Sequence, residues 1–425
     1  MIERTIKAIW HGTFAPFYYN VKLKRAIKTY ERRMPSILNR VRGHDPIRIV
    51  FFPINIGMWK NDYLFQLLQS DSRFEPCVVS FFVPGDNPEF QRRNQEEMRS
   101  FFNSKGYPYY DMYNFETGQW LDVDTIKPDV VIYTQPVNTS YTQYRIQAFW
   151  DNALFYYIPY CMGMENETKG YNTLLFNICL KVFAPSEFHK NYWSSFFLNK
   201  GKNIVVTGYP SFDYLTRPVM KDCAKWKCCD KRKRVIWAPH HSITKEDLLS
   251  YSNFLEIAES MLELTRQYKD SIEFVFKPHP RLRPKLEQID AWGKGRTESY
   301  YQKWKEQDNT NYVDGDYFDL FLSSDAMIHD CSTFMAEYLL TGNPVMFNLR
   351  DESAMNLNKY AEACLKQHYI GRSIEDIKEF LDRVVLGGID YMKNDRIRFV
   401  EEQLKVGSDV LVAQRIYNEI KKDLN

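Results

Sequence analysis

Two short stretches carry side chains suited to binding phosphate. Lys277-Pro278-His279-Pro280-Arg281 places an imidazole between two cationic side chains, directly after the apolar run 272–276. Asp330-Cys331-Ser332-Thr333 follows a second apolar run, 326–329, and its two hydroxyls stand where a helix should begin. Cations, hydroxyls and the unpaired N–H groups of a first helical turn all suit anionic oxygen. Together the two stretches predict a phosphate or diphosphate site, whereas the Ser-Thr pair alone would be more typical of a capped helix that holds nothing.

The second stretch lies within a strand–helix–strand pattern. We expect a strand at Ala326–His329, a helix from Ser332 to about Leu340 with Ser332 and Thr333 as its cap, a stop at Gly342 and a strand at Val345–Phe347. Short apolar strands joined by a helix belong to a parallel sheet. The turn at Asp330 should therefore lie at the carboxyl edge of that sheet.

Other arrangements of reactive residues remain open. His329 and Cys331 form a candidate base–nucleophile pair, but no residue is placed to orient the imidazole. Asp122–Asp124 and Asp314–Asp316 are pairs of the kind that metal-dependent glycosyltransferases use, and equally of the kind found in solvated turns. Cys223, Cys228 and Cys229, with His240 and His241 downstream, lack the ordered ligand pairs of a zinc site. We expect no metal site.

These candidates are positioned by two runs of alternating strands and helices. The first begins with a strand at Ile47–Pro53, which leads into Asn55 and Gly57. The second begins at Arg234–Ala238 and leads into Pro239-His240-His241-Ser242. Such alternation predicts doubly wound α/β domains with ligands at the strand ends. The predicted domains are a basic N-terminal arm at 1–46, a Rossmann-like domain at 47–215, a linker at 216–232, a second Rossmann-like domain at 233–405 and a C-terminal helix at 406–425. We expect the active site in the cleft between the two domains.

Composition limits the partners. The 425 residues are 44% hydrophobic and 16% aromatic, enough for more than one packed core, and a formal net charge of +2 argues against a nucleic-acid binder. Residues 1–46 nevertheless hold ten basic and three acidic residues. A helix at Val21–Met34, stopped by Pro35, would present a basic face to an anionic membrane surface; the alternative is a solvated helix packed on the next domain. With neither a secretory signal nor a run long enough to span a bilayer, we expect a cytoplasmic protein, peripheral at the inner face of the cell membrane.

The ordered motifs also resemble a known family. Asp330-Cys331-Ser332-Thr333, followed by Glu337 and Gly342-Asn343-Pro344-Val345, resembles the Asp-Tyr-Ser-Ser…Asp…Gly-Lys-Pro-Val stretch of the CDP-glycerol glycerophosphotransferases, the teichoic-acid primases and polymerases. Lys277–Pro280 is similar to that family's basic-x-His-Pro element. Ile236–Pro239 is similar to the family's Tyr-Ala-Pro strand end, and Gly208–Asp213 is similar to the family's Gly-x-Pro…Asp segment. The similarity covers roughly residues 125–420.

The resemblance implies a GT-B fold and transfer of a polyol phosphate, such as glycerol phosphate, from a CDP-linked donor to a hydroxyl of a lipid-linked or growing surface glycan. It implies further that residues 47–215 form the acceptor domain, with Asn55 and Gly57 on the acceptor side of the site, and that residues 233–405 form the donor-nucleotide domain. No cofactor is expected beyond the donor, which is a substrate. The donor phosphates would be held by His279, Arg281, Asp330, Ser332 and Thr333, and its polyol or sugar by Glu337, while His240 would act as acid, base or phosphate ligand. Teichoic acid or capsular polysaccharide is the expected product.

One family element is missing. Its Trp-His-Gly histidine, the usual base, has no counterpart in Tyr160-Cys161-Met162-Gly163-Met164-Glu165, so Glu165 is the candidate substitute, while Trp10-His11-Gly12 precedes the whole first domain and is treated as coincidental. The catalytic candidates are thus His240, His279 and Glu165. The alternatives are a GT-B enzyme that transfers a hexose from a nucleotide sugar and a glycan-binding relative that has lost catalysis.

Overall fold

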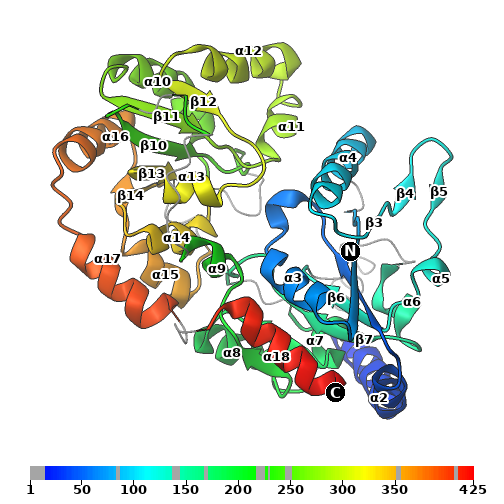
Figure 1. Cartoon of the computed structure of the whole chain (residues 1–425). Coiled ribbons are helices and arrows are strands. Elements are labelled where there is room, and N and C mark those ends of the chain that lie inside the picture. The colour runs from blue at the N-terminus through cyan, green and yellow to red at the C-terminus, as the bar shows by residue number, and fades with distance from the viewer. Residues whose placement is uncertain are drawn as a thin grey trace, which may run out of the picture. The chain divides into compact units, whose positions relative to one another are not determined.

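The chain folds into two compact units in the computed structural model, which describes residues 15–82, 87–135, 144–166, 171–216, 225–227, 230–244, 251–350, 356–405 and 410–425. The first unit comprises Met1–Cys161, Glu167–Tyr209 and Asp409–Asn425, and the second comprises Met162–Asn166 and Pro210–Ser408 (Figure 1). Each contains a parallel sheet with helices packed around it. The predicted pair of doubly wound α/β domains is therefore confirmed.

The first unit is built on a seven-stranded parallel sheet, in the order β3-β2-β1-β6-β7-β8-β9. Its strands are β1 (Ile47–Phe52), β2 (Phe74–Val79), β3 (Tyr109–Tyr110), β6 (Val130–Tyr133), β7 (Leu154–Tyr157), β8 (Lys181–Ala184) and β9 (Ile204–Val206). β6 and β7 are buried along their whole length, as expected for inner strands of a parallel sheet. A separate antiparallel hairpin, β4 (Tyr113–Asn114) with β5 (Gln119–Trp120), follows β3.

The helices of this unit include α18 (Val412–Leu424), from the far end of the chain. It buries Ile416, Ile420 and Leu424 in the first core, at the spacing of one helical face. The sequence places residues 406–425 in a helix of their own, whereas the structure joins that helix to the first unit. The remaining helices are α2 (Ala15–Arg42), η2 (Ile56–Met58), α3 (Asp62–Ser70), α4 (Pro88–Ser104), α5 (Val123–Ile126), α6 (Ile146–Phe149), α7 (Leu174–Ile178) and α8 (Glu187–Ser194).

Helix α2 runs through Pro35 to Arg42, so the prediction that Pro35 stops it is wrong. Proline inside a helix costs about 3 kcal/mol. The apolar stripe that includes Leu23, Tyr30 and Val41 extends past Pro35 and is buried in the first core, which offsets that cost. The described part of the predicted N-terminal arm is thus an integral helix of the first unit; Trp10-His11-Gly12 lies outside the described residues.

The second unit contains a six-stranded parallel sheet in the order β12-β11-β10-β13-β14-β15. Its strands are β10 (Lys233–Ala238), β11 (Ile272–Phe276), β12 (Thr310–Tyr312), β13 (Ala326–His329), β14 (Val345–Asn348) and β15 (Tyr369–Gly371). Its helices are α9 (Ser211–Leu215), α10 (Phe254–Gln267), α11 (Leu282–Leu286), α12 (Gly293–Glu306), α13 (Phe318–Leu322), α14 (Phe334–Glu337), η5 (Tyr338–Thr341), α15 (Lys359–Leu365), α16 (Ile374–Glu379) and α17 (Lys393–Phe399), with π-helical segments at Phe380–Leu386 and Val400–Leu404.

The boundaries between the units differ from the predicted ones. Residues 162–166 and 210–215, expected in the first domain, belong to the second unit. α9 joins that unit through Tyr214, whose ring stacks on Phe318 of α13 at 4.3 Å. Of the predicted linker at 216–232, the structure describes residue 216, residues 225–227 and residues 230–232. Cys223, Cys228 and Cys229 lie outside the described residues.

Candidate functional site

Three neighbouring strands of the second unit bring the predicted phosphate-binding residues to one edge of the sheet. β10 lies between β11 and β13, and the register pairs Trp237 with Phe276 and Ala238 with His329. All three strands therefore end at the same level. The residues that follow them, including His240, His279 and Asp330, converge there, as the two separate stretches in the sequence indicate.

The convergence includes a cluster of three imidazoles. The ring centroids of His240 and His241 are 4.2 Å apart, those of His241 and His279 are 4.2 Å apart, and those of His240 and His279 are 5.0 Å apart. One ring nitrogen from each residue lies within 4.8 Å of the others, a spacing at which three histidines can hold a metal ion. Distance alone therefore allows a metal site.

The hydrogen bonds of these rings favour an anion instead. Nδ1 of His279 accepts the backbone N–H of Arg281 at 3.1 Å, and Nδ1 of His240 accepts the backbone N–H of Ser242 at 3.3 Å. A neutral imidazole whose Nδ1 is an acceptor carries its proton on Nε2. His240 and His279 thus present N–H groups rather than lone pairs at Nε2. Hydrogen-bond donors of this kind suit phosphate oxygens.

Nearby positive charge also favours an anion over a metal ion at this site. Removal from water lowers the pKa of His279 well below its ordinary value, and the charges of His241, His240, Lys277 and Arg281 act in the same direction. Lys277 itself is 4% exposed, and its burial lowers its pKa, a shift that Asp314 partly opposes. A bound polyanion would relieve the repulsion among these groups, whereas a metal cation would add to it.

Asp330 connects two of the strand ends. Its carboxylate accepts the backbone N–H of His240, and it is 2% exposed. Burial raises the pKa of Asp330 to about 6, although hydrogen bonds from His240, Ser252 and Asn253 limit the rise. Asp330 therefore acts on His240 by holding the backbone of its loop. This supports the site without requiring that Asp330 touch phosphate.

The helix after Asp330 differs from the prediction. It consists of one α-helical turn, Phe334–Glu337, continued by the 3₁₀ turn Tyr338–Thr341, and the left-handed Gly342 ends it as expected. Thr333 has helical dihedral angles and makes no side-chain cap hydrogen bond, so the predicted Ser332–Thr333 cap is not formed. Both hydroxyls remain partly exposed at the sheet edge. What they can offer a ligand is the side chains themselves, with little contribution from a helix dipole.

The candidate base–nucleophile pair does not have the environment of a reactive thiol. Cys331 is 7% exposed, and burial raises its thiol pKa well above the ordinary value. His329 accepts the backbone N–H of Cys331 at Nδ1, at 3.2 Å, and is itself buried. A catalytic cysteine needs a lowered pKa and access to substrate. The structure disfavours the thiol-hydrolase alternative.

Glu165 lies in the second unit and not in the domain to which the sequence assigns it. Its segment is attached by a bridge to Leu357, and Asn358 Nδ2 donates to the carbonyl of Gly163 at 2.7 Å. The Glu165 carboxylate adjoins Tyr251: burial raises the pKa of Tyr251, and the charge and hydrogen bonding of Glu165 raise it further. The ring of Tyr251 is 5.8 Å from that of His240. One residue, Tyr251, thus lies between Glu165 and the imidazole cluster.

The other predicted site residues lie in different surroundings. Glu337 is fully buried, and its Oε2 accepts the hydroxyl of Tyr317 at 2.7 Å, so polyol binding by this carboxylate stays a prediction. Asn55 and Gly57 are in the first unit, where Asn55 Oδ1 caps η2 by accepting the N–H of Met58 at 3.0 Å.

The first acidic pair lies at the start of a helix, and the second lies in a loop. Asp122 caps α5, and Asp314 accepts the N–H of Gly315 and the hydroxyl of Tyr312.

Sequence reasoning left several residues out of the site. Tyr251, Ser252 and Asn253 adjoin His240 or Asp330 but lie just before a helix, with no chemical motif around them. His241 follows His240 directly, and the repeated histidine at a strand end was the available signal. Lys277 was visible within the Lys-Pro-His-Pro-Arg stretch, where its burial could not be foreseen.

Comparison with known proteins identifies relatives by sequence and by fold. The family described as CDP-Glycerol:Poly(glycerophosphate) glycerophosphotransferase matches residues 162–422, more than half of the chain, and this match begins where the second unit begins. A sequence search among curated proteins found no significant match.

Solved structures match nearly the whole chain at low identity. The wall teichoic acid polymerase TagF matches with a TM-score of 0.58 at 14% identity, covering 100% of this chain and 98% of that one. MnaA of S. aureus, solved with UDP, has a TM-score of 0.56 at 16% identity, covering 90% and 97%. UDP-GlcNAc 2-epimerase of Neisseria meningitidis, bound to UDP-GlcNAc, has a TM-score of 0.56 at 17% identity, covering 88% and 99%. These matches confirm the predicted GT-B fold with its two Rossmann-like domains.

Proposed function

The chain belongs to the CDP-glycerol:poly(glycerophosphate) glycerophosphotransferase family, and on that basis we propose that it transfers glycerol phosphate, or a similar polyol phosphate, from a CDP-linked donor. The acceptor is a hydroxyl of a lipid-linked or growing surface glycan, in the synthesis of teichoic acid or a capsular polysaccharide. The observation that carries this proposal is the anion-binding arrangement of the second unit, where His240, His279 and Lys277 converge at the sheet edge.

The donor diphosphate would lie against the ends of β10, β11 and β13. The Nε2–H groups of His240 and His279 donate to its oxygens, and the side chains of Arg281, Ser332 and Thr333 contribute further donors. The buried Lys277, which acts on His279 electrostatically, adds positive charge. Hydrogen bonds to charged groups are worth about 1.5–3 kcal/mol each. Because backbone N–H groups orient the two imidazoles before the ligand arrives, their Nε2–H groups stabilise charge that develops during transfer without reorganising.

In the proposed reaction, the acceptor hydroxyl oxygen attacks the phosphorus that carries the polyol. The bond from that phosphorus to the oxygen of CMP breaks, and CMP leaves with the electron pair. The hydroxyl proton passes to a base, for which Glu165 is the candidate because the chain lacks the family histidine and Glu165 lies beside Tyr251 near the imidazole cluster. No metal and no cofactor enters the scheme.

The acceptor is proposed to reach the enzyme at an anionic membrane surface. Helix α2 exposes Lys24, Arg25, Lys28 and Arg32 on one side, with Glu31 as its one acidic residue, and buries its apolar stripe in the first core. Among the described residues, no helix is both long and apolar enough to cross a bilayer. Contact through basic side chains alone is the attachment that this helix supports.

A ligand panel tests the donor. Thermal unfolding is measured with CDP-glycerol, CDP-ribitol, UDP-N-acetylglucosamine, a GDP-sugar and CMP-sialic acid; a ligand at about 100 times its dissociation constant stabilises the protein by about 2.7 kcal/mol. We expect CDP-linked polyols to raise the melting temperature and His279→Ala to reduce that shift. Stabilisation by UDP-N-acetylglucosamine alone would indicate a hexose transferase, and no stabilisation by any compound a glycan-binding relative.

A further inference from the structure

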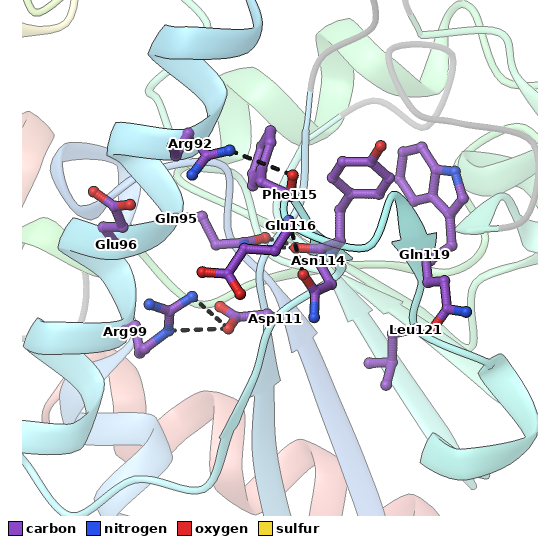
Figure 2. A pocket seen from close by; sticks show the side chains of 12 residues that line it. Arg92, Gln95, Glu96, Arg99, Asp111, Asn114, Phe115, Glu116, Gln119 and Leu121 are labelled. Carbon is purple, nitrogen blue, oxygen red and sulfur yellow. Dashed lines mark hydrogen bonds and ion pairs between the residues drawn. The ribbon is translucent and has the colours of Figure 1, made fainter.

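The first unit contains a cavity that the donor chemistry does not use. It has a volume of about 460 Å³ and lies between helix α4 and the β4–β5 hairpin, with all of its lining residues in the range 92–121 (Figure 2). Ligand sites for small molecules commonly have volumes of about 300–1,000 Å³. The cavity can therefore hold a ligand of about the size of a disaccharide.

The walls of this cavity are held by internal bonds. Arg92 of α4 donates to the carbonyl of Phe115 at 3.3 Å, and its guanidinium lies 5.1 Å from the centre of the Phe115 ring. Arg99 donates twice to Asp111 Oδ2, at 2.6 and 2.9 Å. Gln95 Nε2 donates to the carbonyl of Tyr113 at 2.7 Å. The hairpin is thus fastened to the helix, and the cavity exists without a ligand.

The polar groups left for a ligand are mostly acceptors. Among the described residues, the side chains of Glu96, Glu116 and Gln119 form no hydrogen bond, and Glu116 extends from the hairpin toward α4 in Figure 2. Both guanidinium groups are already bonded to the hairpin or to Asp111. With three carboxylates and two guanidinium groups around it, the cavity carries one net negative charge, which disfavours phosphate.

An aromatic wall completes the cavity. Trp120 is 37% exposed, and its ring centroid lies 4.8 Å from that of Tyr113. A flat aromatic face packs against the C–H groups of a sugar ring, while carboxylate and amide oxygens accept hydrogen bonds from its hydroxyls. This combination suits a neutral polyhydroxylated ligand.

We propose that this cavity binds a neutral saccharide unit. That the saccharide belongs to the acceptor glycan rests on the proposed function; the binding itself does not. Glu96, Glu116 and Gln119 accept from sugar hydroxyls, and Trp120 stacks on the ring. The cavity would then hold a sugar unit of the acceptor glycan.

Saturation-transfer NMR with cellobiose, maltose and N,N′-diacetylchitobiose tests the proposal on the whole protein. At least one disaccharide should give a saturable signal. Trp120→Ala and Glu116→Gln should each raise its dissociation constant tenfold or more, which corresponds to about 1.4 kcal/mol. Tyr391→Ala, which removes a 76% exposed aromatic residue of the second unit, is the matched control and should change nothing.

The outcomes separate this proposal from the donor proposal. Glu116→Gln removes only a charge from an exposed side chain. If Trp120→Ala lowers the stability of the protein, the dissociation constant of Glu116→Gln therefore tests the saccharide site on its own. The absence of a saturable signal from all three disaccharides, or signals unchanged in both variants, would overturn the saccharide site. Inorganic phosphate displacing the sugar would also overturn it. Stabilisation by CDP-glycerol, measured on the same samples, tests the donor site independently.

Discussion

The backbone N–H of Arg281 lies 3.1 Å from Nδ1 of His279 and so determines which nitrogen of that imidazole carries the proton. The same relationship recurs at His240, where the N–H of Ser242 points at Nδ1 from 3.3 Å. Both rings come from the ends of adjacent strands, so two similar loops direct Nε2–H groups into one site. Two of the three rings in a cluster whose spacing would suit a metal thereby present N–H donors at Nε2.

This arrangement predicts that the transfer reaction does not depend on a metal ion. A metal at Nε2 of His279 would require its proton to move to Nδ1, which breaks the bond from Arg281, and the ion would meet the charge of Lys277. We therefore expect polyol-phosphate transfer to persist in EDTA and Zn²⁺ to leave the melting temperature unchanged. Complete loss of transfer in EDTA, restored by Mg²⁺ or Mn²⁺, would contradict this and would direct attention to Asp314 and Asp316.

Asp330 should make stability depend on pH. Its pKa rises from 3.8 to about 6 on folding, so between these values the folded protein binds more protons than the unfolded chain. The free energy of unfolding contributed by this group is therefore fully present below about pH 4 and falls as the pH rises to about 6. Asp330→Asn should remove this part of the decline. Denaturant titrations at several pH values between 4 and 7 measure it, and an unchanged slope in the variant would show that Asp330 does not titrate there.

Much of the fold could be predicted from the sequence, because buried parallel strands are continuous apolar runs. The apolar run 272–276 is β11, and the strand Ala326–His329 has the predicted bounds. Two-residue strands such as β4 and β5 were not foreseen, since a hairpin of that length has no periodicity. The prediction at Pro35 was wrong because the local cost of a proline inside a helix is outweighed by packing farther along α2.

The residues that meet at the candidate site could be predicted from the sequence, whereas the burial of its charged groups could not. The sequence predicts that residues at the ends of the strands lie close together, because the carboxyl ends of parallel strands lie at the same edge of a sheet. The burial of Lys277 and Glu337 could not be read from their types, since charged residues are mostly exposed. The attachment of Glu165 to the second unit could not be predicted either, because it depends on the bridge to Leu357, nearly two hundred residues away.

Membrane attachment through α2 is testable by charge reversal. Lys24 and Lys28 lie one turn apart on its exposed side, whereas Arg33 binds Asp151 and Arg40 donates to the carbonyl of Asn152. Each basic residue near an anionic surface contributes about 1 kcal/mol. Lys24→Glu with Lys28→Glu should therefore reduce flotation with phosphatidylglycerol vesicles at least tenfold.

Salt and a matched variant control that experiment. Wild-type flotation should fall as ionic strength rises, because the contacts are screened. Lys202→Glu with Lys359→Glu reverses two exposed lysines outside the helix and should have a much smaller effect. Equal binding to neutral phosphatidylcholine vesicles at high salt would contradict an electrostatic attachment.

Three substitutions at the sheet edge distinguish phosphate transfer from thiol chemistry. His279→Ala removes a donor from developing charge, and losses of a single such donor reduce kcat by about 100- to 1000-fold. Ser332→Ala removes one hydroxyl that would bond the phosphates of the CDP-linked substrate, and it removes no helix cap. We therefore expect a smaller loss of activity, seen mainly as a higher KM. Cys331→Ser should leave turnover within a few-fold, because the thiol is buried, its pKa is raised and its Sγ contacts the carbonyl of Ala238 at 3.5 Å. Steady-state kinetics of all three with one donor and one acceptor settle the order. An inactive Cys331→Ser variant that still unfolds cooperatively and is still stabilised by nucleotide would reverse the assignment of this turn.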